Sequence, residues 1–250
     1  GTTILFASGR SGSIRPWMVP VAGGPAEMVD VALEGDFHLY WSPDGTQFAF
    51  DAYGPGGDPD LWRIPAQGGE PVPVSGQAGV GESAPAWSPD GETIAYTAGG
   101  AVWLVPASGG EARRLETGPG EAWHPVFSPG GESLLFTLDR GGNLDLWMMP
   151  VSGGETVRLT NDPARDDWGC WSPDGRTLAF QSDRDGADNI WLMDLENGTL
   201  AQATTGSGMN GGSFPHWSPD GTRIVFASQR AGEGSLWIVD VTSLLAALPP

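Results

Sequence analysis

Short apolar runs alternate with segments rich in Gly and Pro along the whole chain. In one unit of this pattern, the runs lie at residues 84–88, 93–97, 101–105 and 112–116. Runs of about five residues that are rich in aromatic and β-branched side chains, and that Gly and Pro bound, are typical of β-strands. The pattern therefore predicts four short strands per unit, and residues 243–248 are the one stretch with a helical period.

The same unit recurs about every 44 residues along the chain. An aromatic residue followed by Ser-Pro-Asp-Gly or Ser-Pro-Gly-Gly stands at Trp41, Trp87, Phe127, Trp171 and Trp217. A second series, out of phase with the first, consists of Trp17, Trp62, Trp103, Trp147, Trp191 and Trp237. The members of the second series predict six repeats, each built from four strands.

The repeated Ser-Pro-Asp-Gly motif has the chemistry of a tight turn. In Ser42-Pro43-Asp44-Gly45, Pro has the φ angle that the second position of a type I turn requires, and Gly tolerates a positive φ at the fourth. The Ser hydroxyl can bond back to the turn backbone. We therefore expect the motif to reverse the first strand of each unit into the second, and we assign it no catalytic role.

Six similar sheets that bury indole rings between them, arranged about one axis, leave no long strand edge exposed. We therefore expect an all-β fold, a single six-bladed β-propeller with four antiparallel strands per blade. The domain would cover residues 1–250, and its blades would lie at about 1–33, 34–79, 80–119, 120–163, 164–209 and 210–250.

The first blade has no innermost strand in the sequence, because its pattern begins at the second strand, residues 3–8. We expect the two termini to pair and close the ring, with residues 241–250 filling the place of the strand. A strand upstream of residue 1 is the alternative.

Further residues repeat in phase with the turn motif. Thr-Leu-Ala-Phe at 177–180 follows one copy, SDRDGADNIWLMD occupies 182–194, and Gly-Gly-Glu precedes other short strands. In these motifs the chain resembles the TolB-like, or PD40, family of WD40-like propellers over nearly its whole length. The resemblance implies a six-bladed binding or scaffold module. In that family the propeller occurs alone, beside another domain as in periplasmic TolB, or capping the catalytic domain of prolyl-oligopeptidase-like and tricorn-like peptidases.

Composition and charge restrict the partners. The chain has 31 acidic and 12 basic residues, a formal net charge of −19, and its bases are all Arg. Such a surface repels the phosphates of nucleic acids and of anionic lipids. It suits basic protein partners or cations, although solubility alone also explains it. We expect a protein or peptide partner, no nucleic acid, and a monomer located in the periplasm or outside the cell.

Membrane insertion is not expected either, because no apolar run reaches the roughly 20 residues that a spanning helix needs. The single cysteine, Cys170, lies in a strand pattern, and we interpret it as a small buried hydrophobic residue.

The chain shows none of the common catalytic motifs. Neither a G-x-S-x-G elbow, a P-loop nor an H-E-x-x-H pair occurs, and there is no Lys. Residues 183–189 are rich in side-chain oxygens but lack the spacing of an EF-hand, so a structural role is favoured over Ca²⁺ binding. Four arginines recur in related hairpins and are expected to pair with carboxylates between loops or blades: Arg10, Arg140, Arg184 and Arg230.

The residues that break the repeat are the candidates for binding. They lie in the segments that lead into the first strand of each blade, which would line one mouth of the central channel. These funnel candidates are His38, His124, His216, Asp36, Glu82, Glu121, Asp166, Asp167, Trp123 and Trp168. His38 and His124 share one offset, three residues before the aromatic of the turn motif, whereas His216 stands one residue before it.

Several ligands fit this composition. Aromatic side chains among acids suit a basic peptide side chain, through a cation–π contact, or a sugar. His38 and His124 are weak candidates to hold Ca, Mn or Zn, although no cofactor is expected. An ordinary solvated funnel without any ligand is also open.

We predict a non-catalytic binding or scaffold propeller. The alternatives are a hydrolase or lyase with a metal-assisted His and carboxylate site at the funnel mouth, and a carbohydrate-binding or sensor domain of a larger protein.

Overall fold

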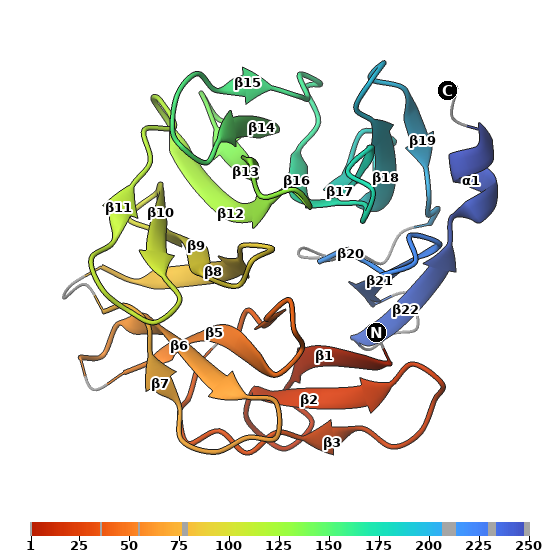
Figure 1. The fold of residues 1–250 in the computed structure, drawn as a ribbon. Helices are drawn as coiled ribbons and strands as arrows, with labels where there is room; N and C mark the ends of the chain where they lie inside the picture. Colours follow the sequence, from red (N-terminus) through yellow and green to blue (C-terminus); the bar gives the residue numbers. More distant parts are fainter. Residues whose placement is uncertain are drawn as a thin grey trace. The chain divides into compact units, whose positions relative to one another are not determined.

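The computed structural model describes residues 2–35, 37–54, 56–76, 80–206, 214–229 and 234–247. In this part the chain forms short antiparallel strands and one short helix (Figure 1). The strands make six small sheets of three or four strands, which is the fold of a six-bladed β-propeller. The predicted all-β class and the predicted number of blades are confirmed.

The first three sheets follow one another along the chain. The first contains β1 (Thr3–Ser8), β2 (Arg15–Pro20) and β3 (Glu27–Met28). The second contains β4 (Tyr40–Trp41), β5 (Gln47–Tyr53), β6 (Pro59–Pro65) and β7 (Val72–Pro73). The third contains β8 (Glu82–Trp87), β9 (Thr93–Ala98), β10 (Ala101–Pro106) and β11 (Arg113–Arg114).

The other three sheets have the same order of strands. The fourth contains β12 (Glu121–Phe127), β13 (Ser133–Asp139), β14 (Leu144–Pro150) and β15 (Val157–Arg158). The fifth contains β16 (Asp166–Trp171), β17 (Thr177–Ser182), β18 (Asn189–Asp194) and β19 (Leu200–Gln202). The sixth contains β20 (His216–Trp217), β21 (Arg223–Ser228) and β22 (Ser235–Asp240), and α1 (Thr242–Ala247) follows it.

The repeated turn motif has the predicted role. The amide of Gly45 donates to the carbonyl of Ser42 at 2.9 Å, and the Ser42 hydroxyl donates to Oδ1 of Asp44 at 2.6 Å. This bond from Ser42 is the main cause that lowers the pKa of Asp44. Gly45 has a φ of +69°, a region that glycine adopts without the strain of a side chain.

The recurring tryptophans of the second series occupy the same position in the hairpin of each sheet. Each tryptophan of the second series stands opposite an aromatic residue on the preceding strand, which stabilises the hairpin through cross-strand contact. The pairs are Phe6–Trp17, Phe50–Trp62, Tyr96–Trp103, Phe136–Trp147, Phe180–Trp191 and Phe226–Trp237.

The chain divides into two compact units, residues 1–117 with 122–127, and residues 118–121 with 128–250. Within each unit the core lies between successive sheets. In the first unit, Leu61 of β6 packs in one buried cluster with Tyr96 of β9. In the second, Leu146 of β14 packs in one cluster with Phe180 of β17.

The C-terminal segment does not pair as a strand over residues 242–247, where the closure of the ring was expected to use it. These residues form α1, and Leu244 and Leu245 pack against the buried cluster around Phe226. Asp240 caps the turn by accepting a bond from the amide of Thr242 at 2.9 Å. The expectation is wrong for this range, because the residues form a short helix from which Leu244 and Leu245, both partly buried, pack against that cluster. Among the described residues, α1 is the one helix, and it is too short to cross a membrane.

Candidate functional site

The inner strands of five sheets, or the residues just before them, share an unusual backbone feature. Five residues other than glycine have a φ between +44° and +54°. They are Phe37, Ala84, His124, Trp168 and Phe214. Side chains other than glycine rarely adopt this left-handed region, which costs roughly 1–3 kcal/mol per residue. The same strained conformation therefore recurs in five sheets. It lies in the segments that lead into the first strand of a blade, where the sequence departs from the repeat.

In the third and fifth sheets, the strained residue lies within a β-bulge of the inner strand. The register of β8 on β9 shifts between Ser83 and Ala86, and that of β16 on β17 shifts between Asp167 and Cys170. At each shift the inner strand has one residue more than its partner. A bulge turns the local side chains away from the direction of a regular strand.

His38 and His124 are not equivalent in the structure, although the sequence places them at one offset. Phe37, not His38, has the left-handed backbone. Phe37 stands four positions before Trp41, whereas each of the other four strained residues stands three positions before the aromatic residue of its turn motif. One inserted residue before β4 accounts for this difference. Counting back from the turn motif therefore aligned His38 with His124, whereas the structure aligns Phe37 with His124.

Asp51 on β5 holds His38 in place. Its Oδ1 accepts a bond from the backbone amide of His38 at 2.6 Å, and its Oδ2 lies 2.7 Å from Nδ1 of the ring. Asp51 is buried, and the His38 side chain is 25% exposed. The centroid of the His38 ring is 6.5 Å from that of His124. The first unit thus brings two of the predicted residues together, half-buried and beside a buried carboxylate.

Glu82 supports the framework of the first unit. Its side chain is fully buried. One oxygen accepts a bond from the amide of Leu61 at 3.3 Å, and the other from the hydroxyl of Ser75 at 2.6 Å. It therefore ties the third sheet to the second. Trp123 is half-buried in β12, Glu121 is exposed at the start of β12, and Asp36 lies outside the described residues.

In the second unit, Trp168 and Phe214 form an aromatic pair, with ring centroids 4.1 Å apart and an angle of 55° between the rings. Trp168 is half-buried and Phe214 is 36% exposed. Asp167 stands just before the bulge, where its Oδ1 accepts bonds of 2.7 Å from the amide of Trp168 and from the hydroxyl of Thr137. His216 is exposed at the start of β20.

Gly169 follows the strained tryptophan for a steric reason. A Cβ atom at Gly169 would lie 2.8 Å from a methyl group of Leu135 and 3.0 Å from one of Leu146. The inner strand β16 therefore approaches the preceding sheet as closely as its backbone permits. This contact fixes the position of the Trp168 backbone.

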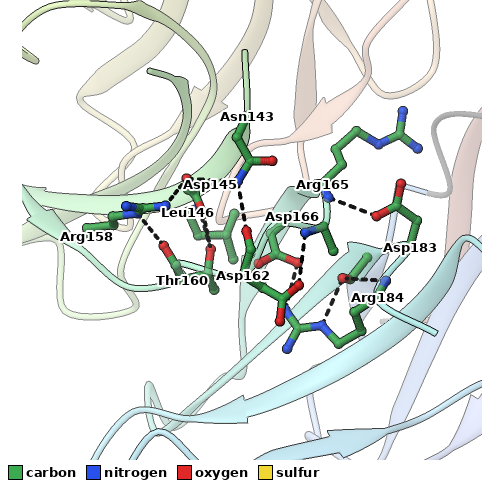
Figure 2. A network of polar contacts seen from close by, with 12 residues as sticks. Asn143, Asp145, Leu146, Arg158, Thr160, Asp162, Arg165, Asp166, Asp183 and Arg184 are labelled. Atoms are coloured by element: carbon green, nitrogen blue, oxygen red, sulfur yellow. Dashed lines mark hydrogen bonds and ion pairs between the residues drawn. The ribbon is translucent and has the colours of Figure 1, made fainter. Parts of the chain in front are cut away.

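Asp166 is buried in a polar network rather than exposed to a ligand (Figure 2). Nη2 of Arg184 donates to its Oδ1 at 2.7 Å, and its Oδ2 has no hydrogen-bond partner among the described residues. Asp145 lies in the same network, where Arg158 donates to it at 2.6 Å. Burial raises the pKa of Asp145, the charge of Arg158 opposes this rise, and the Asp166 carboxylate adds to it.

The recurring arginines share a stacking position more than a carboxylate partner. The guanidinium of Arg184 lies 5.1 Å from the ring centroid of Trp191, that of Arg140 lies 4.2 Å from Trp147, and that of Arg10 lies 5.0 Å from Trp17. The predicted carboxylate pairing is present for Arg184. Arg230 lies outside the described residues.

The described residues offer little for a metal or a covalent mechanism. Within them, no group of three His, Cys, Asp or Glu side chains is placed to hold a metal ion. In the oxygen-rich hairpin, Asp185 accepts bonds from the side-chain amides of Asn189 and Gln202, which accounts for its conformation. Burial raises the pKa of the Cys170 thiol to about 12, so this cysteine packs as a protonated side chain.

Sequence reasoning missed the strained positions of Phe37 and Ala84. Nothing in these side chains signals a left-handed backbone, whereas His is several-fold enriched there. The proline that follows Ala84, His124 and Phe214 gave no signal for it either, because the residue before a proline favours extended backbone.

Comparisons with known proteins agree with the β-propeller fold. A family model described as the TolB beta propeller domain, PD40, matches residues 83–246. The protein TolB homolog of Chlorobium luteolum is 30% identical over 146 residues, 57% of this chain and 33% of that protein. The chain thus spans about a third of the length of this relative.

Solved structures share the fold at low identity. The crystal structure of TolB from Acinetobacter baumannii aligns with a TM-score of 0.81 and 21% identity, over 96% of this chain and 61% of that one. An oligogalacturonate lyase in complex with manganese aligns with a TM-score of 0.65 and 16% identity, over 96% of this chain and 86% of that one. The fold is therefore shared by proteins of different function.

Proposed function

Because the chain belongs to the PD40 family of TolB β-propeller domains, we propose that it is a non-catalytic module that binds a protein or peptide partner through its inner-strand bulges. The observation that carries the proposal is the left-handed residue that recurs on, or just before, the inner strands of five sheets. Three of the five strained residues, His124, Trp168 and Phe214, have partly exposed side chains, and presentation of these side chains to a ligand is a reason to retain the strain.

The aromatic pair of Trp168 and Phe214 is the best-supported contact point. Phe214 is a large apolar side chain that is 36% exposed, and it is in contact with a half-buried indole. Tryptophan is among the residue types enriched at the few positions that contribute most of the binding energy in protein interfaces. We expect this pair to be the anchor of the interface in the second unit.

The charge of the protein selects the kind of partner. A net charge of −19 attracts basic segments over long range, and an indole face adds a short-range cation–π contact worth about 0.5–2 kcal/mol. A peptide segment with arginine or lysine side chains therefore fits better than an acidic one. The location that we predict for this binding is the periplasm or the outside of the cell.

The proposal can be tested by calorimetric titration with an arginine-containing peptide and with a neutral peptide of equal length. At physiological ionic strength the charges of distant residues are largely screened beyond about 8 Å, so local contacts determine the difference. We expect saturable binding of the basic peptide, and a loss of about tenfold in affinity for Trp168→Ala and for Phe214→Ala.

Leu200→Ala is the matched control, because Leu200 is an exposed apolar residue of the outer strand β19 in the sheet that carries Trp168. Its affinity should equal that of the unchanged protein. If all three variants bind the peptide equally, the attraction comes from net charge alone and the proposed site is wrong.

A second function has one observation in its favour. The imidazoles of His38 and His124 approach within 6.5 Å beside the buried Asp51, and the similar lyase structure is a complex with manganese. A metal-assisted lyase or hydrolase is therefore the alternative. It ranks second because the described residues include no group of three metal-binding side chains. Manganese-dependent cleavage of oligogalacturonate that His38→Ala abolishes would support it.

A further inference from the structure

The hairpin that joins β18 to β19 contains an Asn-Gly pair, Asn197 and Gly198 (Figure 1). Both residues are exposed to solvent. Asparagine is a thermolabile residue type, because the backbone nitrogen of the next residue can attack its side-chain amide. A glycine at the next position has no Cβ to shield that nitrogen. This hairpin therefore combines a side-chain amide, an unshielded backbone nitrogen and access to water.

A hydrogen bond folds the Asn197 side chain over the peptide that follows it. The backbone amide of Thr199 donates to Oδ1 of Asn197 at 2.9 Å. Because the donor lies two residues further along the chain, this bond closes an Asx-turn and keeps the side-chain carbonyl beside the Gly198 peptide. The bond also withdraws electron density from Cγ, the carbon that the nitrogen would attack. The hairpin thus positions and polarises the electrophile.

Asp194, the last residue of β18, holds the same hairpin closed. Its carbonyl oxygen accepts a bond from the amide of Gly198 at 2.9 Å. Its Oδ1 accepts bonds from the amides of Glu196 and Asn197 at 2.9 and 3.0 Å. The Gly198 nitrogen must leave its bond before it can attack Cγ, so the reaction requires a brief opening of the hairpin. The bonds to Asp194 therefore limit how often the nitrogen is available.

The Ser-Pro-Asp-Gly turn of the same sheet has this backbone geometry with a different side chain. Oδ1 of Asp174 accepts a bond at 3.1 Å from the amide two residues later, as Oδ1 of Asn197 does. The glycines that follow, Gly175 and Gly198, both have a φ of +72°. The bond from the Ser172 hydroxyl lowers the pKa of Asp174, so this side chain is an ionised carboxylate at neutral pH. A carboxylate is a poor electrophile, whereas the neutral amide of Asn197 can lose ammonia.

We propose that Asn197 is a site of spontaneous deamidation, in which the Gly198 nitrogen is the nucleophile and Asp194 restrains the rate. The Gly198 nitrogen loses its proton and bonds to Cγ of Asn197, the bond from Cγ to Nδ2 breaks, and Nδ2 takes up a proton and leaves as ammonia. Water then opens the resulting succinimide ring. Cleavage of the bond from the nitrogen to Cγ gives aspartate, and cleavage of its bond to the main-chain carbonyl carbon gives isoaspartate.

The two products differ in their effect on the hairpin. Aspartate keeps an oxygen that can accept the bond from the amide of Thr199, in the way that Asp174 accepts its own bond in the turn motif. Isoaspartate adds a methylene group to the main chain and moves that oxygen into the main chain. Either product adds one negative charge to a chain of net charge −19. We therefore expect the hairpin to tolerate aspartate and to be distorted by isoaspartate.

The test incubates the whole folded chain at mildly alkaline pH in water enriched in heavy oxygen, and peptide mapping by mass spectrometry follows each position. Hydrolysis of a succinimide incorporates a solvent oxygen, which marks every new product. We expect Asn197 to react at least about tenfold faster than Asn161, which is also exposed but precedes Asp162. Asn210, the other asparagine before a glycine, lies outside the described residues, and its fragment ions distinguish it. Asp194→Ala should accelerate the reaction at Asn197 about two- to tenfold, because two hydrogen bonds that close the hairpin are lost.

Glu196→Ala is the matched control, because it removes a neighbouring exposed carboxylate and keeps the bond from its backbone amide to Asp194. Its rate should equal that of the unchanged protein. Asn161 reports on global unfolding in the same samples, since unfolding would accelerate both asparagines. The proposed site is wrong if Asn197 reacts no faster than Asn161, or if Asp174 incorporates solvent oxygen as fast as Asn197. Equal rates for the Asp194 and Glu196 variants would overturn the restraint by Asp194.

Discussion

The fifth sheet and the first sheet carry the same central hairpin in two different settings. In both, an arginine stacks on the aromatic pair of the hairpin and donates a hydrogen bond from Nε to a serine hydroxyl. The corresponding distances agree within 0.2 Å, for example 3.1 Å and 2.9 Å for the bond from Nε to the hydroxyl. Of these two sheets, only the fifth has an inner strand and a carboxylate partner within the part of the chain that the structure describes. The arginine is therefore positioned by the local hairpin, and the inner strand is not needed to orient it.

The same comparison separates local geometry from burial. Phe180 is completely buried between β13, β14 and β18, while the equivalent Phe6 is half-buried. An inner strand thus changes how much apolar surface is covered without changing the register of the hairpin. Substitutions in the two sheets can measure the difference.

The largest effect is expected from Phe180→Ala compared with Phe6→Ala. Loss of the fully buried ring should reduce the free energy of unfolding by about 3–5 kcal/mol, because a cavity remains. Loss of Phe6 should cost less than half of that, because water already reaches its ring. Urea denaturation followed by tryptophan fluorescence measures both values. Equal losses would contradict the view that β1 is less buried because no described residue pairs with its second edge.

Arg184→Ala compared with Arg10→Ala gives the next effect. Removal of Arg184 leaves the buried Asp166 without its cation, which should cost about 3 kcal/mol. Removal of the exposed Arg10 should cost less than about 1 kcal/mol. Adding Asp166→Asn to Arg184→Ala should recover part of the loss in the same denaturation experiment, because the unpaired charge disappears. No recovery would mean that stacking on Trp191, and not the ion pair, is the main contribution.

The smallest effect concerns acid. The bond from the Ser172 hydroxyl is the main cause that lowers the pKa of Asp174 in the turn of the fifth sheet. A carboxylate with a lowered pKa in the folded state stabilises the protein above its unfolded pKa of about 3.9, and this contribution is lost as the pH falls through the folded value. Asp174→Asn should therefore cost up to about 1 kcal/mol at pH 7, since the group is exposed to water, and nearly nothing at a pH below the folded value.

The fourth sheet supplies the control for this pH experiment. Its turn contains Gly130 where the others have Asp, and a side chain there would displace the Glu132 carboxylate. In a Glu132→Gln background, Gly130→Asn should therefore show no pH-dependent difference from Glu132→Gln alone. Denaturation midpoints at a series of pH values provide the measurement. A pH-independent loss for Asp174→Asn would mean that the side chain acts through turn geometry and not through its charge.

Much of the fold could be predicted from the sequence because its determinants are local. The positions of Trp191 and of the Ser-Pro-Asp-Gly turns identify strand pairs through alternation and turn preference, which neighbouring sheets do not alter. The candidate site could be predicted only in part. His38 and His124 do lie close together, but the inserted residue before β4 changes which residue is strained. Glu82 and Asp166 were expected at a solvated mouth and are completely buried.

By itself, the sequence determined the number of sheets, the order of strands within each, and the chemistry of the turns, because strand period, proline and glycine act over a few residues. Only the tertiary structure decided which inner-strand residues adopt the left-handed backbone and which carboxylates leave the solvent. These outcomes depend on residues that are distant in the sequence: the methyl groups of Leu135 and Leu146 in the preceding sheet set the approach of Gly169, and Arg184 in the next hairpin of the same sheet compensates the burial of Asp166. No pattern of adjacent residues encodes such contacts.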